Sequence, residues 1–205
     1  MKKIIENLKA TMMVAAFATM GIFTACSSND SKDDSTQTAK TAKSGKVTMT
    51  CYATEALPKY ADVKFVYTIN GEEKSVEISK SDWKSATNTS ENTAFEASKT
   101  IDINSFPQSV KAHVEITPKD STQLTLGTEE DIILGAGFKV SAETKDANSQ
   151  TIKAGTPLFA SGVDVQSILV KPSSFSSVFA FINLLSTEMA KKTCTTTLTQ
   201  DGTIQ

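Results

Sequence analysis

Apolar and polar residues alternate through much of this chain, and this alternation restricts the fold more than any other feature. In the segment DVKFVYTI, residues 62–69, every second side chain is apolar, which is the period of a β-strand with one buried face. Asn70-Gly71 follows directly and favours a type I′ turn, because both central positions of that turn need a positive φ. Residues 62–79 are therefore predicted to form a β-hairpin.

Further segments repeat the alternation, each bounded by turn residues. They cover residues 46–53, 93–103, 109–117, 132–142, 151–155, 167–171 and 193–199. Gly135 and Gly137 interrupt one of them, and glycine inside a strand usually marks a bulge or a close approach of two backbones. About eight short strands separated by turns predict an all-β, antiparallel β-sandwich. Its architecture resembles that of small immunoglobulin-like domains, without the Cys…Trp…Cys spacing of antibody domains.

The period of the pattern changes near the C-terminal end. Between residues 174 and 190, apolar residues fall at spacings of three and four, so they share one face of a helix. These residues are Phe175, Val178, Phe179, Ile182, Leu185 and Met189. Lys191 and Lys192 follow, where a positive charge suits the end of a helix. We predict one helix before the last strand; a buried strand is the alternative, because the segment is rich in aromatic residues.

The first 25 residues have the pattern of a secretory signal peptide. Three lysines precede an uncharged run from Thr11 to Ala25, which is shorter than the roughly 20 apolar residues that a membrane span needs. The run ends in FTAC, residues 23–26, which resembles the lipobox of bacterial lipoproteins, with Phe23 where Leu is usual. The resemblance implies that Cys26 is acylated and becomes the mature N-terminus. The alternative is a secreted protein with a free Cys26.

Acyl chains on Cys26, such as palmitate, would hold the protein at a lipid bilayer. Each buried methylene contributes about 0.8 kcal/mol, so two or three chains make a stable anchor. The next residues, SSNDSKDD at 27–34, resemble the acidic export signal that sends some lipoproteins to the cell surface. We expect a lipid-anchored outer-membrane protein displayed on the cell surface, with a periplasm-facing position as the alternative.

These features divide the chain into three parts. Residues 1–25 are the predicted signal peptide, 26–45 are the lipidated cysteine with a disordered linker, and 46–205 are the sandwich domain. The linker has no large apolar side chain to bury, so nothing offsets the entropy cost of ordering it. As a flexible coil it would span about 24 Å, enough to hold the domain clear of the lipid head groups.

Charge argues against nucleic acid as a partner. All 21 basic residues are lysines, and 23 residues are acidic. Cleavage would remove three lysines and one glutamate from these, leaving 18 and 22 and a mature net charge of −4. Nucleic-acid binding needs a basic face. The chain also lacks the arginine fork that grips phosphate or carboxylate with two parallel hydrogen bonds.

Two cysteines remain once Cys26 is assigned to lipid. Cys51 lies in the first predicted strand and Cys194 in the last, and disulfides persist outside the cytoplasm. A disulfide between them would form a loop that contains most of the domain. Loop-entropy models predict that closing such a loop stabilises the folded state by roughly 4–5 kcal/mol. The alternative is a pair of buried free thiols.

No group of residues has the composition of a catalytic, metal or cofactor site. His113 is the only histidine, and it alternates with core residues on a predicted strand, so we expect it to face solvent or a polar partner. A zinc site needs three or four His or Cys ligands, which the chain cannot supply once Cys26 is acylated. Gly135-Ala136-Gly137 lacks the third glycine of a dinucleotide-binding loop. We therefore expect no enzyme activity, metal or cofactor.

Three aromatic residues near predicted loops are the candidates for ligand contact. Tyr52, Tyr60 and Trp83, the only tryptophan, could stack on sugar rings; the alternative for each is packing in the core. We predict a membrane-anchored binding or interaction module for a protein or glycan that the sequence does not identify. The alternative is a structural or assembly component of an envelope complex, docking through a sheet edge or the helix at 174–190.

Overall fold

Antiparallel strands form most of the chain that the computed structural model describes, which is residues 40–86, 93–123, 132–155, 168–170 and 175–205. The strands are β1 (Ser44–Ala53), β2 (Ala61–Ile69), β3 (Glu72–Glu77), β4 (Lys84–Ser85), β5 (Phe95–Ile103), β6 (Gln108–Pro118), β7 (Ile132–Leu134), β8 (Ala136–Lys145), β9 (Thr151–Gly155), β10 (Ile168–Val170) and β11 (Cys194–Leu198). The helices are α1 (Leu57–Tyr60), α2 (Phe175–Lys191) and a 3-10 turn at Ser121–Gln123. The predicted antiparallel β fold with a helix before the last strand is confirmed.

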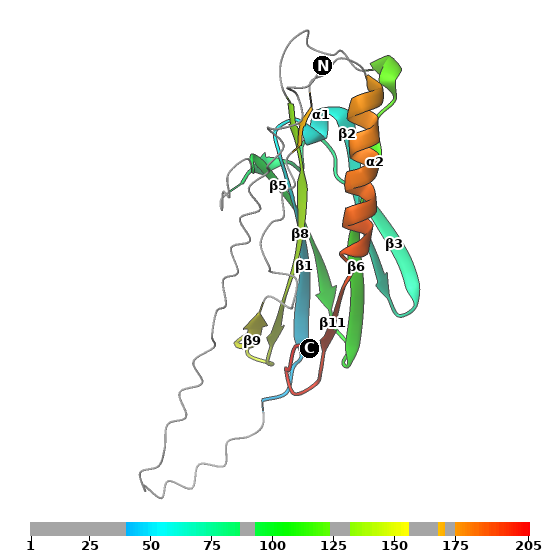
Figure 1. Cartoon of the computed structure of the whole chain (residues 1–205). Coiled ribbons are helices and arrows are strands. Elements are labelled where there is room, and N and C mark those ends of the chain that lie inside the picture. The colour runs from blue at the N-terminus through cyan, green and yellow to red at the C-terminus, as the bar shows by residue number, and fades with distance from the viewer. Residues whose placement is uncertain (1–39, 87–92, 124–131, 156–167, 171–174) are drawn as a thin grey trace, which may run out of the picture. The chain divides into compact units, whose positions relative to one another are not determined.

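Two sheets face each other across one core (Figure 1). The first sheet has the strand order β4-β5-β1-β8-β9, and the second has the order β11-β6-β2-β3. A separate pair joins β7 to β10. Phe65 of β2 and Phe138 of β8 meet between the two sheets, with their ring centroids 6.5 Å apart. The sheets are therefore held together by apolar side chains that the alternating pattern places on their inner faces.

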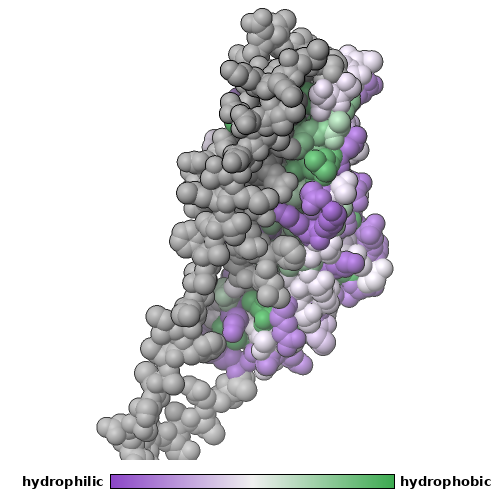
Figure 2. Space-filling model, in the orientation of Figure 1, coloured by the Kyte–Doolittle hydropathy of each residue, from purple (hydrophilic) through white to green (hydrophobic). Residues whose placement is uncertain are grey.

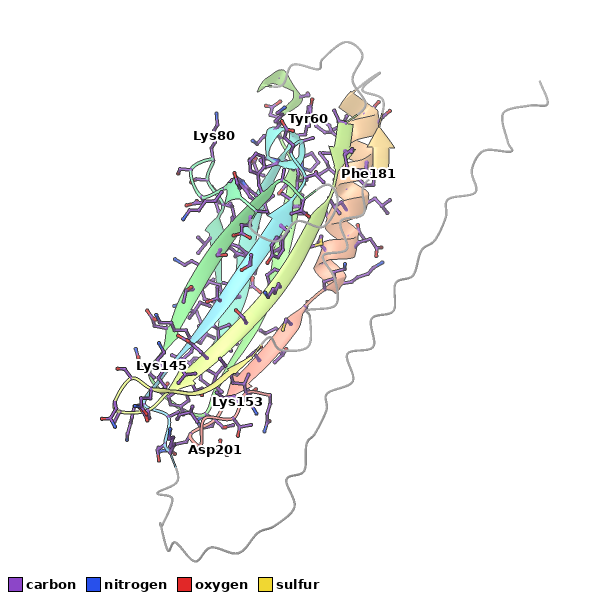
Figure 3. The ribbon with its side chains drawn as sticks, turned by 90° about the vertical axis from the view of Figure 1, so that its left-hand side faces the viewer. Tyr60, Lys80, Lys145, Lys153, Phe181 and Asp201 are labelled. Carbon is purple, nitrogen blue, oxygen red and sulfur yellow. The ribbon has the colours of Figure 1, made fainter. Side chains whose placement is uncertain are left out.

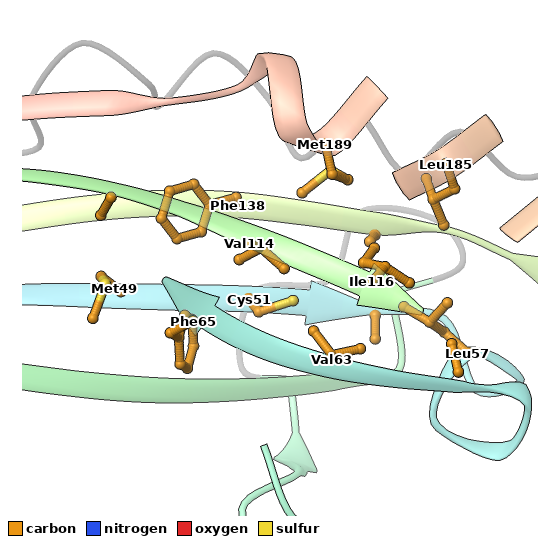
Figure 4. Close-up of a cluster of buried hydrophobic side chains, with 14 of the residues drawn as sticks. Met49, Cys51, Leu57, Val63, Phe65, Val114, Ile116, Phe138, Leu185 and Met189 are labelled. Atoms are coloured by element: carbon orange, nitrogen blue, oxygen red, sulfur yellow. The ribbon is translucent and has the colours of Figure 1, made fainter. Parts of the chain in front are cut away.

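Burial follows the predicted alternation closely. Three alternate residues of β1 are completely buried: Val47, Met49 and Cys51. Lys46, which precedes them in the strand and points to the other face, is exposed. Figure 4 shows this core, to which both sheets and both helices contribute. Its labelled members are Met49, Cys51, Leu57, Val63, Phe65, Val114, Ile116, Phe138, Leu185 and Met189. Each fully buried large side chain contributes about 1.5–3 kcal/mol relative to an exposed one.

The hairpin predicted from Asn70-Gly71 is confirmed. Asn70 has a φ of 55° and Gly71 a φ of 78°, which are the positive values that a type I′ turn requires. β2 and β3 pair on either side of this turn, with Ile69 opposite Glu72. β3 is the edge strand of its sheet and is largely exposed, and its charged residues suit an edge that must not pair with another chain.

Helix α2 closes one side of the sandwich. β11 pairs only with Gln108–Ala112 of β6, and α2 packs along β6 and also contacts β8 of the other sheet (Figure 1). Its buried residues are Val178, Phe181, Ile182, Leu185 and Met189. The predicted helix is therefore correct, but Phe181 is buried where Phe179 was expected, and Phe179 is half-buried. In the view of Figure 2, hydrophobic residues gather on the surface where α2 lies.

The described chain enters the sandwich beside its own C-terminal segment. The amide of Ala42 donates to the carbonyl of Gln200 at 2.8 Å, and the amide of Lys43 donates to the carbonyl of Lys145 at 2.8 Å. Ala42 is only 3% exposed and β1 begins at Ser44, so residues just before Lys46 already pack in the sandwich. Figure 3 shows Lys145 and Asp201 at this end of the sandwich and Tyr60 and Lys80 at the opposite end.

The glycine-interrupted strand is split where a close backbone approach was predicted. Gly135 separates β7 from β8 and is buried. The amide of Gly135 donates to the hydroxyl of Thr54 at 3.0 Å, and the amide of Thr54 donates to the carbonyl of Gly135 at 3.1 Å. These two bonds join the end of β1 to the start of β8, next to the loop that carries α1.

Candidate functional site

A cleft of about 760 Å³ lies at the end of the sandwich opposite the point where the chain enters. Its lining comes from the loop after β1 with α1 and the start of β2, from the end of β3 with the turn that follows it, from the start of β5, and from the residue that follows β6. The aromatic residues in the lining are Tyr60, Trp83 and Phe95. Ligand pockets commonly have volumes of about 300–1,000 Å³ and combine apolar walls with a few polar groups. The cleft has this composition.

Helix α1 forms one wall of the cleft, because its own apolar residues fix it to the core. Leu57 is completely buried and Tyr60 is 7% exposed, and Pro58 occupies the first turn, where its missing amide is tolerated. Lys119 ties this wall to the end of β6. Its side-chain ammonium donates to the carbonyl of Pro58 at 2.7 Å, and its amide donates to the carbonyl of Tyr60 at 3.0 Å.

A tight turn after β3 forms the facing wall and positions Trp83. The carboxylate of Asp82 accepts hydrogen bonds from the amide of Ser79 at 2.8 Å and from its hydroxyl at 2.6 Å. These bonds hold the pKa of Asp82 below its usual value. Trp83 follows the turn, is half-buried and packs against the edge of the core, so one part of its ring system faces the cleft. Asp82 therefore caps the turn that begins at Ser79.

Charges of both signs surround the aromatic residues. The acidic residues of the lining are Glu55, Asp62 and Glu77, and the basic residues are Lys59, Lys80 and Lys119. Lys59 lies 4.0 Å from Glu55, and Lys119 lies 3.8 Å from Asp62. Within the described residues, Glu77 and Lys80 form no ion pair. The lining is therefore electrically balanced, with one carboxylate and one ammonium group not engaged in a pair.

Two of the three predicted contact residues meet in this cleft, and the third does not. Tyr60 and Trp83 both line it. Tyr52 lies on β1, on the face opposite Cys51, and is 6% exposed, so burial raises its pKa, with a smaller contribution from Glu96. Tyr52 is therefore not part of this cleft, and its burial agrees with the alternative of packing within the fold.

The sequence alone did not identify Phe95 and Lys119 as members of the site. Phe95 was expected in the core because it alternates with Ala97, but it is half-buried at the start of β5 and lines the cleft. Lys119 follows a strand that ends in Pro118, and only the pairing of β6 with β2 brings it to Tyr60. Cys26, the predicted lipid attachment site, lies outside the described residues.

Cys51 and Cys194 are not bonded to each other in the structure. Both are free, buried thiols. Cys51 pairs with Ala97 and Phe138 in the first sheet, whereas Cys194 pairs with Ala112 in the second. Burial raises the pKa of the Cys51 thiol to about 12, so it is not ionised at neutral pH. Of the two possibilities left open by the sequence, the structure has the pair of buried free thiols and not the disulfide.

His113 belongs to a small polar cluster on the outer face of β6. Its Nε2 lies 3.4 Å from Glu115 Oε1, and Glu115 Oε2 lies 2.8 Å from the ammonium of Lys64 on β2. The hydrogen bond from Lys64 is the main cause of the lowered pKa of Glu115. This arrangement agrees with the predicted polar contact of His113.

Across residues 40–205, apart from the gaps given above, no three His, Cys, Asp or Glu side chains are grouped so that they could hold a metal ion. Neither helix that the structure describes is long and apolar enough to cross a membrane.

Comparisons with known proteins find no match to this chain among family models, curated proteins or solved structures.

Proposed function

We propose that this chain is a lipid-anchored lipoprotein of the outer membrane, displayed at the cell surface, whose sandwich is a binding module with its site in the Trp83 cleft. The N-terminal signal pattern and the sequence FTAC at residues 23–26 support the anchor. The observation that carries the binding role is the cleft itself, because aromatic and charged side chains from several elements converge there.

The position of the cleft suits a protein held to a membrane by its N-terminal end. The chain enters the sandwich at Ala42 and Lys43, and β1 then runs to Ala53, next to the cleft. Ten residues of strand cover about 30 Å. An anchor at Cys26 would therefore attach to the domain through the end that lies opposite the cleft and would leave the cleft accessible.

We also infer that the sandwich is immunoglobulin-like. Such domains have the strand order A-B-E-D in one sheet and C-F-G in the other, with C′ added beside C in variable domains. Assigning β1 to B, β2 to C, β3 to C′, β4 to D, β5 to E, β6 to F and β11 to G reproduces this order. β8 occupies the place of strand A, although it follows F in the chain.

This assignment supports the choice of site. In variable domains, the loops B–C, C′–C″ and F–G lie at one end and form the binding surface. The cleft lies at the equivalent end here and is lined by residues of the connections B–C and C′–D and by Lys119, the first residue after strand F. A shared fold does not by itself imply a shared function, so the binding role depends on the chemistry of the lining.

The alternative, an assembly component of an envelope complex, requires an apolar docking face on α2 or on a sheet edge. Among the described residues, Leu184 is the only large hydrophobic side chain that is clearly exposed, at 50%. Its neighbours on the outer face of α2 are small or polar, including Ala180, Asn183 and Thr187. The hydrophobic surface that Figure 2 shows over α2 therefore contains one exposed large side chain among small ones, and a single such residue is normal on a protein surface, so the cleft has the stronger support.

Two measurements test the anchor and its location. Cys26→Ala should abolish incorporation of labelled palmitate and move the protein out of the detergent phase on partitioning. Cys51→Ser is the matched control, because it leaves the lipid attachment residue unchanged, and it should incorporate label normally. Protease added to intact cells should release the domain from the wild-type protein. Cleavage only after rupture of the outer membrane would contradict surface display.

A further inference from the structure

Three aromatic residues line the cleft at separate places along its wall. Tyr60 ends α1, Trp83 follows the turn after β3, and Phe95 begins β5. Trp83 and Phe95 are only half-buried, although aromatic side chains contribute most to stability when they are fully covered. Ring surface therefore remains open toward the cleft, and it suits a ligand that has an apolar face of its own.

The charges of the cleft do not suit an ionic ligand. Three carboxylates and three ammonium groups line it. An anion attracted by one lysine is therefore repelled by a neighbouring carboxylate, and a cation attracted by a carboxylate is repelled by a neighbouring lysine. The chain also has no arginine for two-point recognition of phosphate or carboxylate. Ionised side chains still make strong hydrogen bonds to neutral groups. A hydroxyl group can donate to a carboxylate and accept from an ammonium group, so a ligand rich in hydroxyls can use both kinds of charge.

We propose that the Trp83 cleft binds a neutral carbohydrate. A pyranose ring has a face of C–H groups that packs on an aromatic ring and an edge of hydroxyls that reaches the surrounding charges. Glu77 and Lys80 are the first candidates for the hydroxyl contacts, because neither is engaged in an ion pair within the described residues. This inference depends on the proposed binding function and names the chemical class of its ligand.

Trp83 makes the proposal measurable, because it is the only tryptophan of the chain and lines the cleft. The full chain, purified in detergent micelles, is titrated with neutral oligosaccharides of glucose, galactose, mannose, xylose and N-acetylglucosamine while tryptophan emission is recorded. At least one of them should shift or quench the emission in a saturable way. A parallel titration uses a pool of uncharged decapeptides.

Two variants on the same edge strand separate a specific site from a general effect. Glu77→Gln removes the charge of a lining carboxylate and should weaken oligosaccharide binding about tenfold, the loss expected for one charge-assisted hydrogen bond. Glu73→Gln makes the same change four residues away on β3, outside the lining, and should leave the affinity unchanged. Equal affinities of the two variants would overturn the assignment of the hydroxyl contacts to this cleft.

The outcomes also distinguish the two proposals. No saturable change with any oligosaccharide would overturn the carbohydrate inference. If the peptide pool then changed Trp83 emission in a saturable way, the proposed binding function would be retained, with a peptide as the ligand class. If neither pool did so and the protein were not released from intact cells by protease, the proposed function itself would fail.

Discussion

Replacing Gly202 by alanine should destabilise the domain more than the same change at another glycine with a similar backbone. Gly202 has a φ of 86°, a value that costs an ordinary residue about 1 kcal/mol. An added Cβ would lie 2.5 Å from Cγ2 and 3.0 Å from Cβ of Ile152. Because the Ile152 Cβ is fixed by the backbone of β9, side-chain rotation cannot remove both contacts. Overpacking of this kind adds about 1–3 kcal/mol.

Gly71 is the matched control. Its φ of 78° is similar, but nothing lies within 4 Å of the Cβ that alanine would add. Gly71→Ala should therefore cost only the backbone term, about 1 kcal/mol. Gly202→Ala should cost about 2–4 kcal/mol when the backbone and packing terms are combined.

Urea unfolding followed by Trp83 emission measures both variants. With a slope of about 2 kcal/mol per molar urea, Gly202→Ala should lower the midpoint by about 1–2 M and Gly71→Ala by about 0.5 M. Ile152→Ala combined with Gly202→Ala removes the atom at the shortest distance, so the double variant should lose less stability than the two single variants added together. Equal midpoints for the two glycine variants would refute the packing argument.

Three other predictions follow from the structure. The pKa of Asp82 is lowered by hydrogen bonds from Ser79, so its stabilisation of the turn is present at neutral pH and is lost as the pH falls below the usual carboxyl value; Trp83 emission should change there, and Asp82→Asn should remove this pH response. The Cys51 thiol has a pKa of about 12 and is buried, so a thiol reagent at mildly alkaline pH should label it only after unfolding in urea. Thr54→Val leaves the buried amide of Gly135 without its hydroxyl acceptor and should cost about 1–3 kcal/mol in urea unfolding, whereas Thr54→Ser keeps the bond and should cost less.

Local chemistry explains why most of the strands could be predicted. The turn at Asn70-Gly71 depends on the φ preferences of two residues, and the alternation in β1 and β6 requires only that one face be buried. The helix α2 was predicted from spacings within a single segment. Phe179, at the margin of the buried face of α2, was expected to be buried but is only half-buried. The width of that face depends on β6 and β8, which lie outside the segment.

The candidate site was harder to predict because it depends on pairing between distant segments. Tyr60 and Trp83 were chosen individually as aromatic residues near loops, and nothing in the sequence placed them in one cleft. Lys119 reaches Tyr60 only because β6 pairs with β2 along their full length. Tyr52 was chosen on the same grounds as the others, and its position in the alternation of β1 could have separated it from them.

The path of β1 has a mechanical consequence. A carbohydrate held in the cleft on one side and a lipid anchor on the other would pull the domain along β1, from its start at Ser44 to its end at Ala53. Hydrogen bonds to β5 and β8 flank this strand on both sides and lie perpendicular to it. A load along the strand therefore acts on all these bonds together, in shear. If the proposed anchor and binding site are correct, force between them would pass through a strand that is hydrogen-bonded on both sides.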